Sequence, residues 1–139
     1  MKNILIILSS ILIIASCGKY ERPFITFRSP EKRLIDKTWK LEKIVDVDGN
    51  EILSTQTIRF SIEGNDSILV RTIDNISYTG SWNWLPALDG KVDKQRIVTN
   101  IQITQGNYSQ VIYDLKVLTS KEIELIDRNQ ASRYFFIKE

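Results

Sequence analysis

From residue 37 onward, apolar and polar residues alternate along most of the chain. A period of two is typical of β-strands that have one buried and one exposed face. Segments rich in Gly, Asn and Asp separate the alternating runs, at spacings near the roughly 8–12 residues that are typical of all-β sandwiches and barrels. Strands are therefore predicted over residues 39–47, 58–62, 68–72, 76–84, 97–103, 111–117, 123–125 and 133–138.

A short helix is predicted before the first strand. Ser29 is suited to the N-cap, Pro30 to the first helical position and Glu31 to the first turn. Lys32 stands where a capping box needs Glu or Gln, so one or two turns are expected, ending near Lys37. The chain contains no βαβ pattern. The sequence thus predicts an all-β fold of roughly eight antiparallel strands, either an up-and-down barrel or a β-sandwich.

The N-terminal segment has the features of an export signal. Lys2 precedes an apolar run over residues 4–14, which is shorter than the roughly 20 residues that a membrane-spanning helix needs. The following Ile-Ala-Ser-Cys, which ends at Cys17, resembles the lipobox of bacterial lipoproteins. This resemblance implies cleavage before Cys17 and its acylation, with fatty acids such as palmitate. In lipoproteins of enteric type, a residue other than Asp directly after the cysteine favours the outer membrane, and Gly18 stands at this position. An ordinary signal peptide and a short buried helix are the alternative interpretations of the N-terminal segment.

The chain therefore divides into three predicted parts: a signal peptide over 1–16, a lipidated cysteine and tether over 17–29, and a β-domain over 30–139.

The composition of the chain excludes several classes of function. The 139 residues carry a net charge of +2, so there is no basic field for a nucleic-acid partner. His is absent and Cys17 is the sole cysteine, which leaves no common metal site, disulfide framework or His base.

A family resemblance follows from the strand pattern. A short helix leads into Thr38-Trp39, about eight meandering strands follow, and the last strand is rich in aromatic residues. This looks like the small lipocalin-like domains of bacterial outer-membrane lipoproteins. In lipocalins, a Gly-x-Trp on the first strand closes the barrel base and an Arg near the last strand lies over the ring. The resemblance implies that Trp39 is this Trp and Arg133 this Arg, whereas Lys37 stands at the glycine position.

The acidic residues do not form a convincing catalytic or metal site. Asp46 begins an EF-hand-like alternation of carboxylates, but Glu51 and Thr57 stand where the Gly and the bidentate Glu belong. A hairpin turn at Asp48-Gly49 is the preferred interpretation. Glu122 and Glu124 alternate with apolar neighbours, so they are expected on the solvated face. We therefore expect that the protein is not an enzyme and that it binds no metal ion and no cofactor.

Tyr78, Trp82 and Trp84 share one face of the fourth strand and are the candidate ligand-binding residues. They suit a calyx for a small hydrophobic ligand, but an eight-stranded barrel is just wide enough to be filled by side chains. If all the large rings point inward, a filled core is favoured. The rings in question are Trp39, Phe60, Tyr78, Trp82, Trp84, Tyr113 and Phe135.

Three functions remain open at this stage. The first is a binding module for a small hydrophobic ligand at the outer membrane. The second is an accessory subunit of an outer-membrane protein complex, with residues 85–95 as the expected contact loop. The third is an inhibitor of a secreted enzyme.

Asp66-Ser67-Ile68 resembles a short bacterial O-glycosylation motif, which makes Ser67 a candidate glycosylation site.

Overall fold

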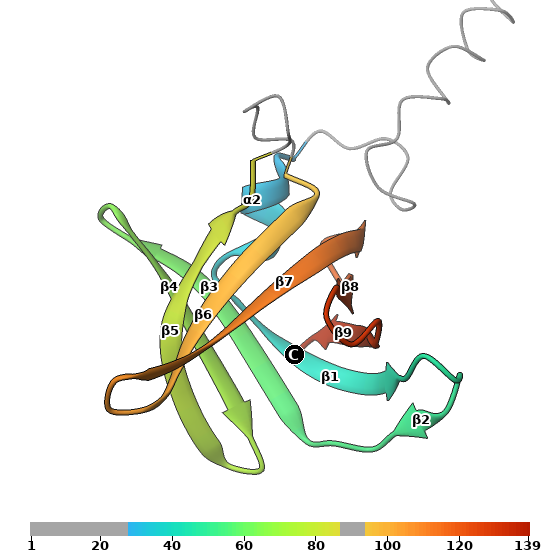
Figure 1. Ribbon diagram of the computed structural model, residues 1–139. Coiled ribbons are helices and arrows are strands. Elements are labelled where there is room, and N and C mark those ends of the chain that lie inside the picture. Colours follow the sequence, from blue (N-terminus) through green and yellow to red (C-terminus); the bar gives the residue numbers. More distant parts are fainter. Residues whose placement is uncertain (1–27, 87–93) are drawn as a thin grey trace, which may run out of the picture.

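The computed structural model describes residues 28–86 and 94–139, and within them it shows a closed antiparallel β-barrel (Figure 1). Each strand pairs with the next in the order β1-β3-β4-β5-β6-β7-β8-β9, and pairing of β1 with β9 closes the barrel. The short β2 pairs with β1 alone and is an addition to the eight barrel strands. The elements are α2 (Pro30–Leu34), β1 (Lys37–Val45), β2 (Glu51–Ile52), β3 (Gln56–Glu63), β4 (Asp66–Ile73), β5 (Ile76–Trp84), β6 (Arg96–Thr104), β7 (Asn107–Leu118), β8 (Glu122–Asp127) and β9 (Arg133–Lys138).

This architecture confirms the predicted all-β class, the antiparallel barrel and the preceding helix, and it is consistent with a lipocalin-like fold. The β-sandwich alternative is wrong, because the barrel strands form one closed sheet and not two packed sheets. The predicted lipidation site at Cys17, the signal peptide and most of the tether lie outside the described residues, as does most of the loop over 85–95. No helix of the described residues is long and apolar enough to cross a membrane.

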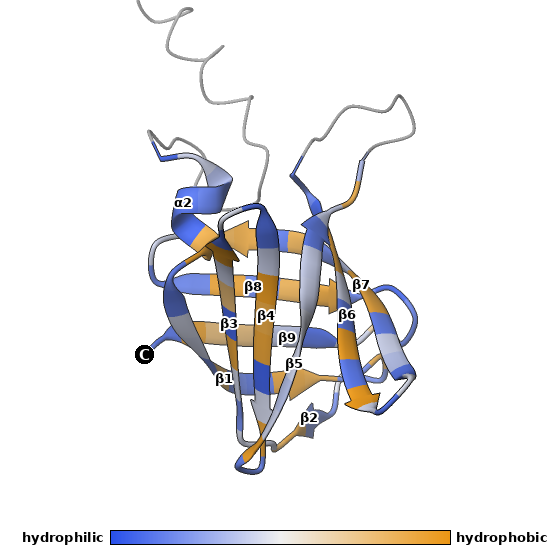
Figure 2. Cartoon of the chain, turned by 90° about the vertical axis from the view of Figure 1, so that its left-hand side faces the viewer, coloured by the Kyte–Doolittle hydropathy of each residue, from blue (hydrophilic) through white to orange (hydrophobic). Residues whose placement is uncertain are grey.

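The helix α2 covers one end of the barrel (Figures 1 and 2). Ser29 caps it, since its hydroxyl accepts a hydrogen bond from the backbone N–H of Lys32 at 3.3 Å. Leu34 ends the helix and is fully buried, and its carbonyl accepts a hydrogen bond from the Trp39 indole at 2.9 Å. Trp39 is itself fully buried. The indole therefore ties α2 to β1 and helps to close this end of the barrel.

The half of the barrel next to α2 is filled with apolar side chains. Phe60 lies opposite Lys37, the first residue of β1, and Leu69 lies opposite Phe60 on the next strand. Both are fully buried, and the Phe60 ring meets the edge of the Trp82 ring with centroids 5.5 Å apart. The fully buried side chains of the core are Leu34, Trp39, Phe60, Leu69, Trp82, Ile97, Leu118, Ile123 and Leu125. This arrangement agrees with the filled-core interpretation for this half of the interior.

The β4–β5 hairpin closes in a tight two-residue turn. Asp74 and Asn75 both have positive φ, 48° and 67°, and lie between the paired residues Ile73 and Ile76. Such a two-residue turn matches the right-handed twist of the flanking strands.

The β1–β2 turn differs from the predicted two-residue turn. It extends from Asp46 to Asn50, and within it Gly49 has a positive φ, 87°, while Asp48 does not. The Asp46 carboxylate accepts hydrogen bonds from the backbone N–H groups of Asp48 and Asn50 at 2.9 and 2.8 Å. The side-chain and backbone hydrogen bonds from Asn50 are the main reason that the pKa of Asp46 is lowered. This carboxylate holds the turn in place.

The strands β5 and β6 are paired along only part of their length. The ladder joins Gly80–Trp84 to Ile97–Ile101, and residues 76–79 are not paired with residues 102–104. Gly80 stands at the start of this ladder, where a Cβ atom would collide with the Asn100 carbonyl and come within 2.8 Å of the Ile101 Cα. The two strands therefore approach closely at Gly80 and then separate toward the far end of the barrel, which we define as the end opposite α2.

Candidate functional site

A cluster of polar and aromatic side chains lies inside the barrel between the apolar core and the far end. Its centre is Arg71 on β4, whose Nη2 and Nε atoms donate to the Gln56 Oε1 at 2.7 and 3.2 Å. The Nη1 atom of Arg71 donates to the Tyr113 hydroxyl at 3.4 Å, and the guanidinium lies 5.9 Å from the centre of the Tyr134 ring. We call Gln56, Arg71, Tyr78, Tyr113 and Tyr134 the arginine site.

Strand register brings these residues together. Arg71 lies directly opposite Tyr78 on β5 and two residues beyond the buried Leu69, so both side chains point inward. Tyr113 and Tyr134 come from β7 and β9, across the barrel, and their rings meet edge to face with centroids 5.9 Å apart. Arg71 and Tyr78 are half-buried, so solvent reaches the site.

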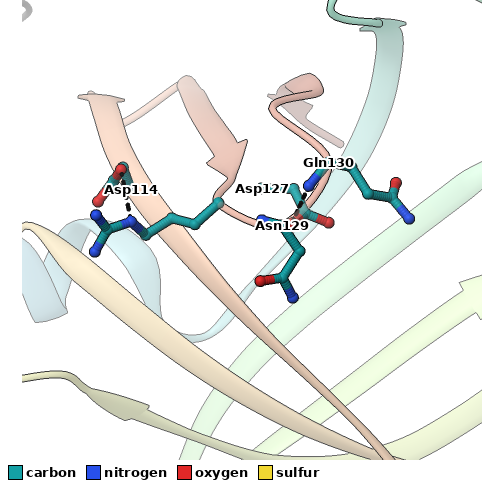
Figure 3. A network of polar contacts seen from close by, with 5 residues as sticks. Asp114, Asp127, Asn129 and Gln130 are labelled. Carbon is teal, nitrogen blue, oxygen red and sulfur yellow. Dashed lines mark hydrogen bonds and ion pairs between the residues drawn. The ribbon is translucent and has the colours of Figure 1, made fainter.

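The charge of Arg71 has neutral hydrogen-bonding partners. The ion pairs of the described residues do not include Arg71, although a buried charge is normally paired with an opposite one. The carboxylate of Asp127, a buried residue opposite Tyr113, accepts hydrogen bonds from the backbone N–H groups of Asn129 and Gln130 at 2.7 and 3.2 Å (Figure 3). Nearby, Arg128 forms an ion pair with Asp114 at 3.5 Å. The carboxylates of Asp127 and Asp114 therefore bind groups of the β8–β9 turn.

The Tyr113 hydroxyl is a neutral donor at ordinary pH. Burial raises the pKa of Tyr113 to about 12, and the positive charge of Arg71 offsets part of this increase. The hydroxyl oxygen accepts a hydrogen bond from Arg71 and keeps its own proton for donation.

This pKa predicts a loss of stability at alkaline pH that depends on Tyr113. The unfolded state ionises near pH 10, whereas the folded state holds its proton until about pH 12. Between these values the unfolded state binds fewer protons, so the free energy of unfolding falls as pH rises, by about 2–3 kcal/mol in total. In Tyr113→Phe this decrease is expected to be smaller, measured as urea unfolding free energies at pH 8, 10 and 12. Equal pH dependence in the two proteins would contradict the assignment.

A shallow pocket of about 380 Å³ lies at the far end, where β5 and β6 are not paired. Tyr78 of the arginine site lines it together with Ile76 and Ile103, which are 58% and 57% exposed. The other lining residues are polar: Ser77, Thr79, Gln102, Thr104 and Gln105. Apolar side chains with this exposure at the rim of a barrel are available for contact with a ligand or a partner. The pocket and the arginine site share Tyr78, so they are adjacent.

The three candidate ligand-binding residues do share one face of β5, but the structure separates their surroundings. Trp82 is 1% exposed and its indole donates to the Ser61 carbonyl at 3.1 Å, so it belongs to the core. Tyr78 belongs to the arginine site. Trp84 is half-buried and meets the Trp82 ring edge to face with centroids 5.6 Å apart. Its buried indole nitrogen has no hydrogen-bond partner among the residues that the structure describes.

This unpaired indole leads to a prediction for Trp84. An unsatisfied buried donor costs about 1–3 kcal/mol, so removing it offsets the packing lost with the larger ring. Trp84→Phe is therefore expected to change the free energy of unfolding by less than about 1 kcal/mol. Trp82→Phe, which leaves the Ser61 carbonyl without its donor, is expected to cost about 1–2 kcal/mol more. Urea denaturation of both variants measures the difference, and equal losses would argue against it.

The structure corrects the expected role of Arg133. On β9, Lys138 pairs with Trp39, whereas Arg133 lies five residues away and pairs with Val45. The Arg133 guanidinium instead forms an ion pair with Glu124 at 2.5 Å and lies 5.3 Å from the centre of the Phe135 ring. The cation over Trp39 is Lys37, with its Nζ 5.4 Å from the ring centre. Arg133 therefore cannot cover Trp39.

Two further expectations about β8 and β9 are wrong. Glu124 was expected on a solvated face but is 6% exposed, and its carboxylate is paired with the Arg133 guanidinium. Phe135 was counted among the inward rings, but the cations of Lys43 and Arg133 lie 5.4 and 5.3 Å from its ring centre and it is not part of the core cluster. Tyr134 and Phe136 are the buried aromatic residues of β9.

Comparison with known protein families and sequences does not identify a relative of this protein. The chain matches no model of a protein family and no curated protein sequence. The described residues hold no group of three or more His, Cys, Asp or Glu side chains that could bind a metal ion. The fold is a closed eight-stranded antiparallel barrel, which is consistent with a lipocalin-like fold, and the arginine site is its most distinctive interior feature.

Proposed function

We propose that this protein is a lipid-anchored outer-membrane lipoprotein whose barrel binds a small hydrophobic ligand without converting it chemically. The anchor is proposed from the lipobox-like sequence that ends at Cys17. The observation that supports ligand binding is the arginine site, which places hydrogen-bond donors inside a barrel beside an apolar rim. A mainly apolar site with a few polar groups is the usual form of a small-molecule pocket.

Native mass spectrometry tests this proposal. The mature protein, isolated from its own host, is expected to begin at Cys17, to carry fatty acyl groups on that residue, and to show a separate non-covalent mass that is lost on denaturation. A peptide map in which Cys17 is unmodified would overturn the anchor. Absence of a non-covalent mass, together with no binding of any alkyl-chain compound to the purified protein, would overturn ligand binding.

A second candidate function is an accessory subunit of an outer-membrane complex. Val47 and Leu53, on either side of β2, are 71% and 90% exposed, and Ile52 is 45% exposed. Exposed apolar side chains that gather on one hairpin are typical of contact surfaces for other proteins. Photo-cross-linking in intact membranes tests this candidate. It would be favoured if a photo-reactive residue at position 53 forms a cross-link to an outer-membrane protein and one at position 59 does not.

A further inference from the structure

The arginine site has the chemistry of an anion receptor. We infer that it binds the carboxylate of a single-chain amphiphile, with the head at Arg71 and Tyr113 and the alkyl chain directed toward the far end of the barrel. This inference rests on the proposed function and names the class of its ligand. Its starting point is a guanidinium inside a barrel whose hydrogen-bonding partners are neutral.

The hydrogen bonds of Arg71 leave donors for a second partner. A guanidinium carries five N–H groups. Nε and one N–H of Nη2 are used on Gln56, and one N–H of Nη1 is used on Tyr113. One N–H on each terminal nitrogen therefore has no acceptor among the described residues. Two terminal donors side by side match the two oxygens of a carboxylate, which arginine binds in a bidentate manner.

The neighbours of Arg71 strengthen the preference for an anion. Tyr113 offers its hydroxyl proton, since its oxygen already accepts from Arg71. The Gln56 amide oxygen is occupied by Arg71, and the Gln56 amide nitrogen donates to the Ser54 hydroxyl at 2.8 Å. The Asp127 carboxylate is held by the backbone of its turn. The negative charge of Asp127 helps to raise the pKa of Tyr113. The positive charge of Arg71 and its two unused N–H groups nevertheless favour an anionic head over a cationic one.

The filled core determines the direction of the alkyl chain. On the α2 side of Arg71, Leu69 and Phe60 are fully buried and Trp82 is 1% exposed, so there is no room for a chain among them. On the other side, Ile76 and Ile103 are more than half exposed and line the pocket that also contains Tyr78. A ligand whose head reaches Arg71 therefore places its chain against these apolar side chains.

Calorimetric titration with two probes of equal chain length tests the inference. The protein is the chain with Cys17→Ser, purified without detergent, and the probes are dodecanoate and dodecanol. Dodecanoate is expected to bind about tenfold more tightly than dodecanol, since a hydrogen-bonded charge contributes that much. Arg71→Met keeps the length of the side chain and removes its charge, and it is expected to weaken dodecanoate binding about tenfold or more while leaving dodecanol binding unchanged.

Arg59→Met is the matched control, because Arg59 is exposed on the neighbouring strand β3. The same loss of charge on the outside of the barrel is expected to leave binding of both probes unchanged. If Arg71→Met does not fold, Tyr113→Phe provides the second variant and is expected to weaken dodecanoate binding several-fold. Equal affinities for both probes, or no effect of either inner variant, would overturn the carboxylate site while the ligand-binding function stands. No binding of either probe would overturn the carboxylate site, and if the native protein also carried no non-covalent mass, the proposed ligand-binding function would be overturned as well.

Discussion

Replacing Trp82 with Ala is expected to lower the free energy of unfolding by about 3–5 kcal/mol, the usual loss for a large aromatic ring in a core. Trp82 is 1% exposed, packs edge to face on Phe60 and Trp84, and donates its indole N–H to the Ser61 carbonyl. The truncation removes these contacts, leaves a cavity and deprives a buried carbonyl of its donor. Urea denaturation followed by far-UV circular dichroism measures the loss.

Trp84→Ala is the matched control for this prediction. The two residues lie on the same face of β5, but Trp84 is half-buried and its indole nitrogen has no hydrogen-bond partner within residues 28–86 and 94–139. Its truncation is expected to cost clearly less than that of Trp82. If Trp82→Ala kept wild-type stability and instead abolished ligand binding, the assignment of Trp82 to the core would be wrong.

Gly80→Ala is expected to destabilise the barrel by about 3 kcal/mol or more, even though it adds a single methyl group. The added Cβ would meet the backbone of Asn100 and Ile101 on β6, and backbone atoms cannot rotate away as a side chain can. Gly80 also begins the β5–β6 ladder, so the clash would act on the pairing that keeps these strands together. Thermal unfolding monitored by circular dichroism measures the effect.

The control for Gly80 is Gly106→Ala in the β6–β7 turn. Gly106 has a φ of 84° and no atom within 4 Å of an added Cβ, so its replacement introduces backbone strain but no clash. This variant is expected to lose about 1 kcal/mol. A loss at Gly80 no larger than that at Gly106 would show that the close approach of β5 and β6 does not limit stability.

The strands were predictable where one face is apolar and the other polar. The bounds predicted for β5 and β9 match the observed Ile76–Trp84 and Arg133–Lys138. The alternation over residues 76–84 is regular, which fixes both the strand and its inward face. The two-residue β2 was missed, because Glu51 and Ile52 are too few for a period to be seen and both are exposed.

The inward face was not predictable where both faces are apolar. The alternation of Ile68, Val70 and Thr72 predicts that these residues share the apolar face of the third strand, but the residues that point inward on β4 are Leu69 and Arg71. Three consecutive apolar residues, 68–70, fit either phase, and pairing with β3 decides between them. The same ambiguity over residues 134–137 placed Phe135 inside in error.

The arginine site was missed for the same reason. With Ile68, Val70 and Thr72 inward, Arg71 would face solvent and carry no functional meaning. Its partners Gln56 and Tyr113 lie 15 and 42 residues away in the sequence, and only the strand register brings them to it. Arg71 stands two residues after the apolar Leu69 and therefore shares its face of the strand. This spacing was the signal that could have identified the site.

The proposed site lies far from the point where the rest of the chain joins the barrel. Residue 28 precedes α2, which covers one end of the barrel (Figure 1). The pocket beside Tyr78 lies at the far end, where β5 and β6 are not paired. If Cys17 carries the proposed anchor, the anchor and the ligand site are connected to opposite ends of the barrel. A ligand can then exchange at the far end without displacing α2.

The central claim is that a carboxylate is held inside the barrel by Arg71, and carbon-13 NMR of dodecanoate labelled at its carboxyl carbon tests it most directly. A positive neighbour that donates hydrogen bonds stabilises the ionised form of an acid and lowers its pKa. The bound carboxyl resonance is therefore expected to titrate at a lower pH than free dodecanoate in the wild-type protein, and to lose this shift in Arg71→Met. A bound carboxyl that titrates like the free acid in both proteins would contradict the account.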